Sequence, residues 1–381
     1  MLIIFWCSVG LILYTYVMYP LILLIWASLR TAKQSPEGNQ ELPTVSVIVA
    51  MYNEESSIEE RVRNLKNISY PKDKIEFLFG SDGSTDKTNE IFAKSKAQNF
   101  RLMVFSKRRG KAAVLNDLVK ETKGEVIVFS DANTFYVADT LQRLVGHFSD
   151  PGIGGVCGEL LLQSEGRTVG GFGEKYYWKY ENFLKNIESK VHSAVGATGA
   201  VYAIRKTLFR PLPTSIPVTD DFLNAMAVLE QGFRVTYDSE AVAYEKPADS
   251  ISGEFRRKTR IGTANFNGIS QFLSLLNPTR GYVAFALWSH KIIRWIVPFL
   301  LIIIISTSIA LGLNSKAFQM FVLLETMLLA IALLGLFFDR LNVRIGILGL
   351  PYYFFAMNSA LFVGFMKFAL RRKNPTWEVV R

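Results

Sequence analysis

The chain is poor in cysteine and histidine, with two cysteines and three histidines among 381 residues. Cys7 lies in the first hydrophobic run and Cys157 lies far downstream, so we expect no disulfide, as suits a reducing compartment. His147, His192 and His290 form no pair at the helical spacing of a metal site. Gly-x-Ser-x-Gly and Walker-type loops are also absent, as are nucleic-acid-binding motifs. These absences argue against a serine hydrolase, a P-loop enzyme or a nucleic-acid partner.

Charge is missing from three long stretches, residues 1–29, 295–315 and 345–366, and a fourth, 317–338, is apolar except for Glu325. A helix needs ~20 apolar residues to cross a bilayer, so the sequence predicts four membrane spans. The first run is too long for the core of a signal peptide and lacks a basic start. We therefore expect an uncleaved anchor and a lipid bilayer as a partner.

Basic residues beside the spans predict the topology. Arg30 and Lys33 follow the first span, which places the next segment in the cytoplasm of a bacterial-type inner membrane protein that crosses more than once. Three further spans would leave the basic tail, 371–381, outside, against the same rule. Residues 345–366 contain Pro351 and are our candidate for a re-entrant or interfacial segment. The formal net charge of +10 fits basic residues that face anionic lipid.

Strand-like and helix-like stretches alternate after the first span. Such alternation predicts an α/β domain built on an open sheet, with ligands at the carboxyl ends of the strands. The expected strands are 45–50, 75–79, 102–105 and 126–130, and the expected helices include 56–65, 85–97, 111–119, 176–184 and 218–230. The predicted division is an anchor at 1–29, a linker at 30–43, the α/β domain at 44–249, interfacial helices at 250–285, three spans within 286–370 and a basic tail at 371–381.

Acidic residues follow two of the expected strands. Asp82 could accept hydrogen bonds from a nucleotide, or it could form a turn or an N-cap. Asp131 and Asn133 flank one small residue, and two oxygen ligands at that spacing can hold Mg²⁺ or Mn²⁺ on a diphosphate. The alternative is a loop turn with capping side chains.

A second acidic pair opens the helix expected at 218–230. Asp220 and Asp221 could compensate the helix dipole there, or one of them could deprotonate an acceptor hydroxyl. Basic clusters occur at 107–111 and 256–260. They are typical of solvated or lipid-facing surfaces, but Lys111 or Arg260 would neutralise a diphosphate if it pointed into a cleft.

Together these segments resemble the membrane-bound family 2 glycosyltransferases, the group of cellulose, chitin, hyaluronan and poly-N-acetylglucosamine synthases. The resemblance covers roughly residues 42–265 and the flanking spans. It is carried by 45–55 (VSVIVAMYNEE), 81–86 (SDGSTD), 109–116 (RGKAAVLN), 130–134 (SDANT), 196–200 (GATGA) and 219–221 (TDD).

The resemblance implies a GT-A-like, Rossmann-related mixed-sheet domain with a helical transmembrane bundle, and an inverting transferase that uses a nucleoside-diphosphate sugar, with UDP-sugars favoured. Its general base would be Asp221, beside Asp220, and its metal ligands Asp131 and Asn133. Donor contacts would come from Ala50, Tyr52, Glu54, Asp82, Lys111, Asp131, Arg257 and Arg260. The acceptor would meet Gly196, Ala197, Thr198 and Gly199. Trp178, with Tyr180, is a candidate stacking platform, although aromatic residues at helical spacing more often belong to a core.

Two departures from the family pattern bear on function. Asn133 replaces the second acid of the DxD metal motif, which weakens the metal prediction. The QxxRW motif of processive synthases corresponds to 257–261, which keeps Arg260 but loses the glutamine and the tryptophan. Residues 291–295 match the QxxRW motif better, but they lie late in the sequence, at the second span. We therefore favour addition of a sugar to a lipid-linked glycan in cell-surface polysaccharide synthesis over processive extension of a polymer. A non-catalytic scaffold is the third alternative.

Overall fold

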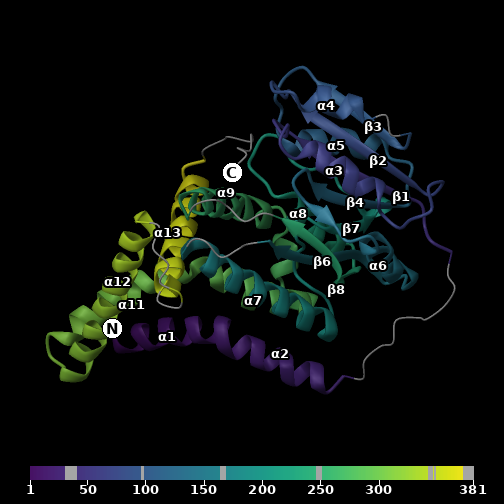
Figure 1. Cartoon of the computed structure of the whole chain (residues 1–381). Coiled ribbons are helices and arrows are strands. Elements are labelled where there is room, and N and C mark those ends of the chain that lie inside the picture. The colour runs from purple at the N-terminus through teal and green to yellow at the C-terminus, as the bar shows by residue number, and fades with distance from the viewer. Residues whose placement is uncertain are drawn as a thin grey trace.

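The computed structural model describes residues 1–30, 41–95, 98–163, 169–245, 251–341, 346 and 349–371. Most of the predicted linker, 30–43, and nearly all of the basic tail, 371–381, lie outside these residues. The chain forms a sheet domain at one end and a group of long helices at the other, with α7 and α9 between them (Figure 1).

One eight-stranded sheet organises the domain, in the order β3-β2-β1-β4-β7-β6-β8-β5. The first four strands are parallel, and β7 joins β4 and β6 antiparallel, so the sheet is mixed as predicted. The four strands expected from the sequence are all present. The strands are β1 (Val45–Met51), β2 (Ile75–Asp82), β3 (Phe100–Phe105), β4 (Val126–Asp131), β5 (Phe135–Tyr136), β6 (Ile153–Leu162), β7 (Tyr202–Arg205) and β8 (Arg234–Glu245).

Helices cover both faces of this sheet. Their positions agree with the predicted alternation, although α7 is much longer than the aromatic stretch suggested. They are α3 (Ile58–Lys66), α4 (Thr88–Lys94), α5 (Lys111–Glu121), α6 (Thr140–Gly146), α7 (Val169–Val191), α8 (Asp220–Glu230) and α9 (Ile251–Ile269). The other described α-helices are α1 (Leu2–Leu13), α2 (Tyr19–Ser28), α10 (Tyr282–Ala286), α11 (Ile293–Gly312), α12 (Lys316–Arg340) and α13 (Gly349–Ala369), with π-helical turns η1 (Tyr14–Met18) and η6 (Leu287–Ile292).

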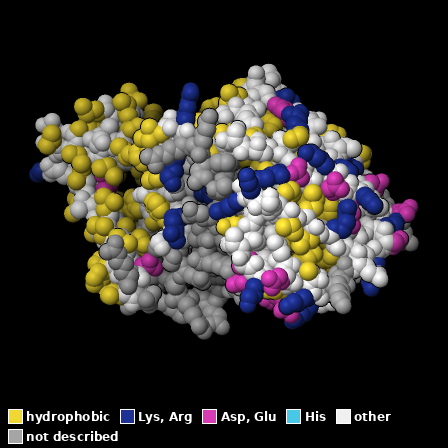
Figure 2. Space-filling model, turned by 90° about the horizontal axis from the view of Figure 1, so that it is seen from above, with side chains coloured by type: hydrophobic (Ala, Val, Ile, Leu, Met, Phe, Trp, Pro, Cys, Tyr) yellow, Lys and Arg dark blue, Asp and Glu magenta, His cyan; other side chains and the backbone are white. Residues whose placement is uncertain are grey.

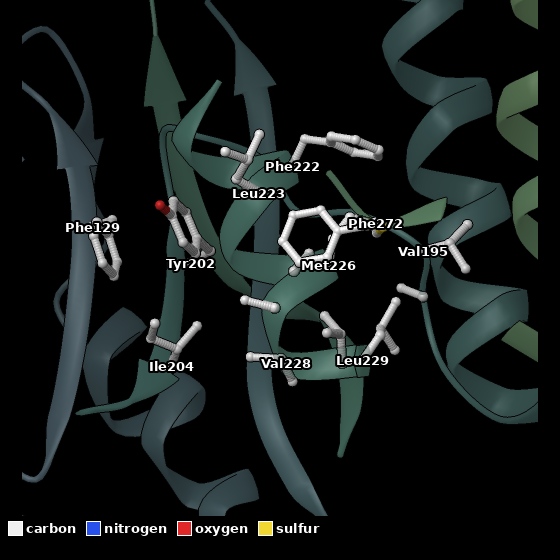
Figure 3. Packing of buried hydrophobic residues seen from close by; sticks show 14 of the residues in the cluster. Phe129, Val195, Tyr202, Ile204, Phe222, Leu223, Met226, Val228, Leu229 and Phe272 are labelled. Atoms are coloured by element: carbon white, nitrogen blue, oxygen red, sulfur yellow. The ribbon is translucent and has the colours of Figure 1, made fainter. Parts of the chain in front are cut away.

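The core forms two apolar layers, because alternate residues of a buried strand point to opposite faces. Ile48 of β1 belongs to the layer under α5 and α8, whereas Val47 and Val49 belong to the other. Figure 3 shows the first layer, where the rings of Phe129 and Tyr202 stack with centroids 4.7 Å apart. This packing fixes β4 and β7 side by side, and both strands lead into the site described below.

Three helical segments among the described residues are long and apolar enough to cross a membrane, namely Leu2–Ser28, Tyr282–Gly312 and Lys316–Asp339. Hydrophobic side chains gather at this helical end of the molecule, and charged side chains spread over the sheet end (Figure 2). The fourth expected span, 345–366, overlaps α13, which is not among the three. It packs along α9, where Thr263 Oγ1 donates to the carbonyl of Gly364 at 3.1 Å.

Buried polar contacts join the first two apolar segments to the domain. Glu188 of α7 is fully buried, accepts a hydrogen bond from Tyr19 Oη at 2.7 Å and lies 2.6 Å from His290 Nδ1. Tyr14 and Thr15 both contact Ser289 on η6. The helical end is therefore attached to the sheet domain through specific side chains as well as apolar packing.

Candidate active site

A cavity of about 910 Å³ opens at the carboxyl ends of the central strands. Because β1 and β4 run parallel with Ala50 opposite Asp131, the last residues of both strands reach its wall together. Within the strands nearly every side chain is apolar and buried, so the first polar groups occur where each strand ends. The sequence pattern predicted this edge as the ligand site.

Asp82 ends β2, but its buried carboxylate serves the protein backbone. One oxygen accepts from the N–H of Arg109 at 2.7 Å, and the other accepts from Gly110 at 2.9 Å. Gly110 has a φ of +97°, a conformation that glycine adopts without strain, and α5 begins at the next residue. Asp82 therefore fixes the loop that positions Lys111. This contact agrees with the turn-forming alternative, whereas direct contact of Asp82 with a nucleotide stays a prediction.

Lys111 lies between two carboxylates. Its Nζ is 2.7 Å from Asp131 Oδ1 and 2.9 Å from Asp220 Oδ1. Burial alone would lower the pKa of Lys111, but the two carboxylates outweigh it and raise the pKa above its usual value. This ammonium stays charged and ties the end of β4 to the start of α8.

The two acids of α8 have different surroundings. Asp220 is buried and accepts a hydrogen bond from Tyr202 Oη at 2.8 Å, so both of its oxygens are engaged. Asp221 faces the cavity and accepts from the N–H of Gly199 at 3.1 Å. Burial, then the neighbouring Asp220, raise the pKa of Asp221 to about 6, which Lys111 partly opposes. Asp220 is thus a fixed anchor, and Asp221 has a proton affinity suited to a general base.

Asp131 and Asp221 face the same space, and Gly199 leaves it open. A Cβ on Gly199 would lie 3.6 Å from Asp221 Oδ2 and 3.8 Å from Asp131 Oδ2. Both carboxylates also line the one cavity. A metal-ligand candidate and a base candidate therefore flank a common point, which the predicted chemistry requires.

The glycine-rich segment continues along the cavity wall. Gly196, Ala197 and Thr198 all line it, and Lys185 Nζ donates to Thr198 Oγ1 at 2.5 Å. Lys291, from η6, approaches the other end, because a Cβ on Gly196 would lie 3.9 Å from its Nζ.

Trp178 lines the same chamber, half-buried, and Lys185 and Lys258 lie 5.6 and 5.9 Å from its ring centroid. The platform prediction for Trp178 is thus compatible with the geometry.

The two predicted arginines of α9 both line the cavity but differ in their partners. Arg257 forms ion pairs with Glu174 and Glu254. Arg260 has no ion-pair partner among the described residues, and its Nε is buried without a hydrogen bond. Burial, then the nearby Arg257, lower the pKa of Arg260, although a guanidinium remains protonated at neutral pH. Arg260 is therefore a cavity cation that is available for an anionic ligand.

Asp131 and Asn133 bring oxygen atoms to the cavity, as hard divalent cations require. No cluster of three or more His, Cys, Asp or Glu side chains placed to hold an ion occurs in the described ranges. The donor set therefore fits a cation held partly by the protein and completed by phosphate oxygens. Asn133 Nδ2 donates to Glu245 Oε1 at 2.8 Å, and burial, then Asp131, raise the pKa of Glu245 to about 7.

Two predicted donor residues lie outside the cavity wall, which includes Ala50 and Glu54 but neither Asp82 nor Tyr52 among its described residues. The Tyr52 ring instead lies 3.9 Å from the guanidinium carbon of Arg108. Direct contact of Tyr52 with a donor therefore stays a prediction without support from this geometry.

Sequence reasoning missed several cavity residues. Lys185 and Glu245 carry no local motif, and only the folded chain brings them to the site. Arg294 and Trp295 belong to the string that seemed too late in the sequence, yet both line the cavity. Trp295 packs edge-on against Phe222, the residue after Asp221, with ring centroids 5.7 Å apart.

Comparison with known structures defines the class of the fold. Mannosyltransferase PcManGT from Pyrobaculum calidifontis, solved with GDP-Man and Mn²⁺, aligns with a TM-score of 0.73 at 21% identity, over 97% of this chain and 99% of that one. The mixed sheet thus belongs to a GT-A-like fold, as the sequence resemblance implied.

Comparison of sequences identifies the domain. Residues 46–211 match the model of Glycosyl transferase family 2, so the chain contains a glycosyltransferase family 2 domain. Probable glycosyltransferase YdaM of Bacillus subtilis is 26% identical over 258 residues, which is 62% of this chain and 59% of that protein. Poly-beta-1,6-N-acetyl-D-glucosamine synthase of Staphylococcus aureus is 24% identical over 237 residues, 60% and 56% of the two chains. The chain thus spans little more than half the length of these relatives.

Proposed function

We propose that the protein is an inverting glycosyltransferase that moves a sugar from a nucleoside-diphosphate sugar to a lipid-linked glycan. The observation that carries this proposal is the space beside Gly199, which Asp131 and Asp221 face from their separate elements. Transfer with inversion needs a held diphosphate on one side of the anomeric carbon and a base on the other. The cations beside Asp131 and the carboxylate of Asp221 support these two roles, within a family 2 domain.

The donor diphosphate would lie against Lys111 and Arg260. Lys111 is fixed by Asp131 and Asp220, and Arg260 lines the cavity without an ion-pair partner among the described residues. Asp131 and Asn133 would hold Mg²⁺ or Mn²⁺, which supplies positive charge to a diphosphate leaving group. Prepositioned cations of this kind stabilise charge that develops in the transition state.

Asp221 would act on the acceptor. Its carboxylate, held by the Gly199 N–H, takes the proton of an acceptor hydroxyl as that oxygen bonds to the anomeric carbon. The bond from that carbon to the diphosphate oxygen breaks, and the nucleoside diphosphate leaves with the electron pair. Attack from the face opposite the leaving group inverts the anomeric configuration.

The proposal of a lipid-linked acceptor rests on the extension of the cavity toward the apolar helical segments. Its wall includes Tyr16, Lys291 and Trp295, which lie in two of the segments able to cross a membrane. An acceptor that reaches Asp221 along this wall would approach from the helical end. We therefore propose a glycan attached to lipid as acceptor. The cytoplasmic side proposed for the sheet domain is supported by Arg30, which follows the first apolar segment.

A donor screen tests the proposal. Purified protein with UDP-sugars and with GDP-mannose, the ligand bound in the mannosyltransferase structure, should release nucleoside diphosphate from one donor class, and Mn²⁺ or Mg²⁺ should stimulate it. Asp221→Asn should lose turnover and keep nucleotide affinity. Release that is unchanged in Asp221→Asn would remove the residue from the base role, and no release from any donor would favour the scaffold alternative.

One observation favours processive polymerisation as a second candidate. The loss of the QxxRW tryptophan argued against it, but Trp295 brings an indole ring to the cavity beside α8 from another helix. Product length separates the two candidates. Discrete short products indicate single addition, and a long ladder indicates a processive synthase.

A further inference from the structure

Asn133 and Glu245 meet through strand pairing between distant parts of the chain. The short strand β5 runs antiparallel to the end of β8, with Phe135 opposite Tyr244. Asn133 precedes β5, and Glu245 is the last residue of β8, so the pairing brings the two side chains together. Their contact is a hydrogen bond from Nδ2 to Oε1 of 2.8 Å, and both residues line the cavity.

This contact fixes which end of the Asn133 amide faces a cation. A carboxylate accepts hydrogen bonds, so Glu245 selects the NH₂ end of the amide. The carbonyl oxygen, the end that can bind a hard cation, then points away from Glu245. An asparagine without such a partner could rotate its amide and present NH₂ to the cation.

The contact also brings a carboxylate to the position where the DxD pattern would have its second acid. Asn133 stands at the position where the DxD pattern has its second acid. Glu245 lies against that same side chain, and Asp131, Asn133 and Glu245 all line the same cavity. Asp131 and Glu245 together therefore supply the two carboxylates that a DxD motif would supply alone.

We propose that Glu245 is the positioning residue of the metal site, which orients the carbonyl of Asn133 and replaces the missing acidic charge. The inference rests on the proposed metal requirement. Groups that orient metal ligands typically change metal affinity by about 10–100-fold when they are removed.

The test measures Mn²⁺ binding by electron paramagnetic resonance of the detergent-purified full chain with UDP or GDP, at about pH 8, where carboxylates are ionised. Glu245→Gln should weaken Mn²⁺ binding about 10–100-fold and leave metal-free nucleotide affinity unchanged. Glu240→Gln makes the same substitution at an exposed position of β8 and should change neither.

The double variant Asn133→Asp with Glu245→Gln swaps the two groups. It keeps the charge and reverses the hydrogen bond, and it should restore Mn²⁺ affinity to near the wild-type value. Glu245→Gln with Mn²⁺ affinity within about twofold of wild type overturns the proposal, since the expected loss is at least about tenfold. A wild-type protein that turns over its donor but binds no Mn²⁺ overturns the metal role and this inference, and leaves glycosyl transfer standing.

Discussion

Asp221 should give the reaction an acidic limb centred near pH 6. Burial, followed by the charge of Asp220, raises the pKa of this carboxyl from 3.8 to about 6. A base accepts a proton only when it is ionised, so kcat/KM should rise about tenfold per pH unit below pH 6 and level off above it. At about pH 5 roughly one tenth of Asp221 is ionised, so kcat/KM should be about a tenth of its plateau.

Two neighbours should move this limb in opposite directions. Asp220 raises the pKa of Asp221 and Lys111 lowers it. Asp220→Asn should therefore shift the midpoint to lower pH, and Lys111→Met should shift it to higher pH. Paired shifts of opposite sign identify the titrating group as one that lies between these two side chains.

The assay is release of nucleoside diphosphate at limiting donor, from about pH 4.5 to about pH 8, because kcat/KM reports the free enzyme. Asp221→Asn is the control and should lose activity by about 10²–10⁴-fold, with no acidic limb in what remains. A wild-type profile without an inflection between about pH 5 and pH 7 would refute the reasoning, as would equal shifts in both neighbour variants.

Three further perturbations follow from the same geometry. Asp221→Asn should raise the thermal midpoint at pH 8 but not at pH 4. The folded pKa of Asp221, about 6, exceeds the ordinary 3.8, so ionisation of this carboxyl lowers the free energy of unfolding by on the order of 3 kcal/mol above pH 6 and not at all below pH 4. Gly199→Ala should fold normally and lose transfer, because its methyl would lie 3.6 Å from Asp221 Oδ2. Gly146→Ala at the end of α6, with nothing within 4 Å, should leave transfer unchanged and raise stability by at most about 1 kcal/mol through helix propensity. Tyr202→Phe removes the hydrogen bond to Asp220 and should lower the free energy of unfolding by about 1–3 kcal/mol, measured by denaturant titration.

The sequence was sufficient for the parts of the site that local patterns determine. An apolar strand followed by a polar residue predicts a ligand edge, and Asp131 does lie in the cavity wall. The two acids lie at the start of α8 as expected, but their surroundings differ in the structure. Asp220 contacts Tyr202 and Lys111, whereas Asp221 faces the cavity. Adjacent helical residues point about 100° apart, so one pair yields two environments.

Contacts between distant segments could not be predicted from the sequence. Glu245 reaches Asn133 through pairing of β5 with β8, and β5 is only two residues long. In the sequence, nothing distinguishes Lys185 from any other lysine of an amphipathic helix. Its hydrogen bond to Thr198 depends on the packing of α7 in the folded chain. For Asp82 the motif left ligand contact and turn formation open, and in the fold both of its oxygens accept from backbone N–H groups of the loop before Lys111.

The attachment of α7 to the apolar segments should matter for the acceptor and not for the donor. Glu188 is fully buried between Tyr19 and His290, and loss of one partner from a buried polar cluster costs about 3–5 kcal/mol. Glu188→Ala should therefore lower the thermal midpoint and loosen the wall that carries Lys291. Lys111 and Asp131 belong to the sheet domain, so hydrolysis of the donor without acceptor should persist.

The measurement is the ratio of acceptor-dependent transfer to acceptor-independent donor hydrolysis in detergent-purified protein. This ratio should fall in Glu188→Ala and stay constant in Lys190→Ala, which removes an exposed side chain from the same helix. Equal loss of both activities would mean that the donor pocket depends on the same attachment. An unchanged ratio with a lowered midpoint would mean that the acceptor does not use the wall formed by the apolar segments, and the route proposed for a lipid-linked substrate would then be wrong.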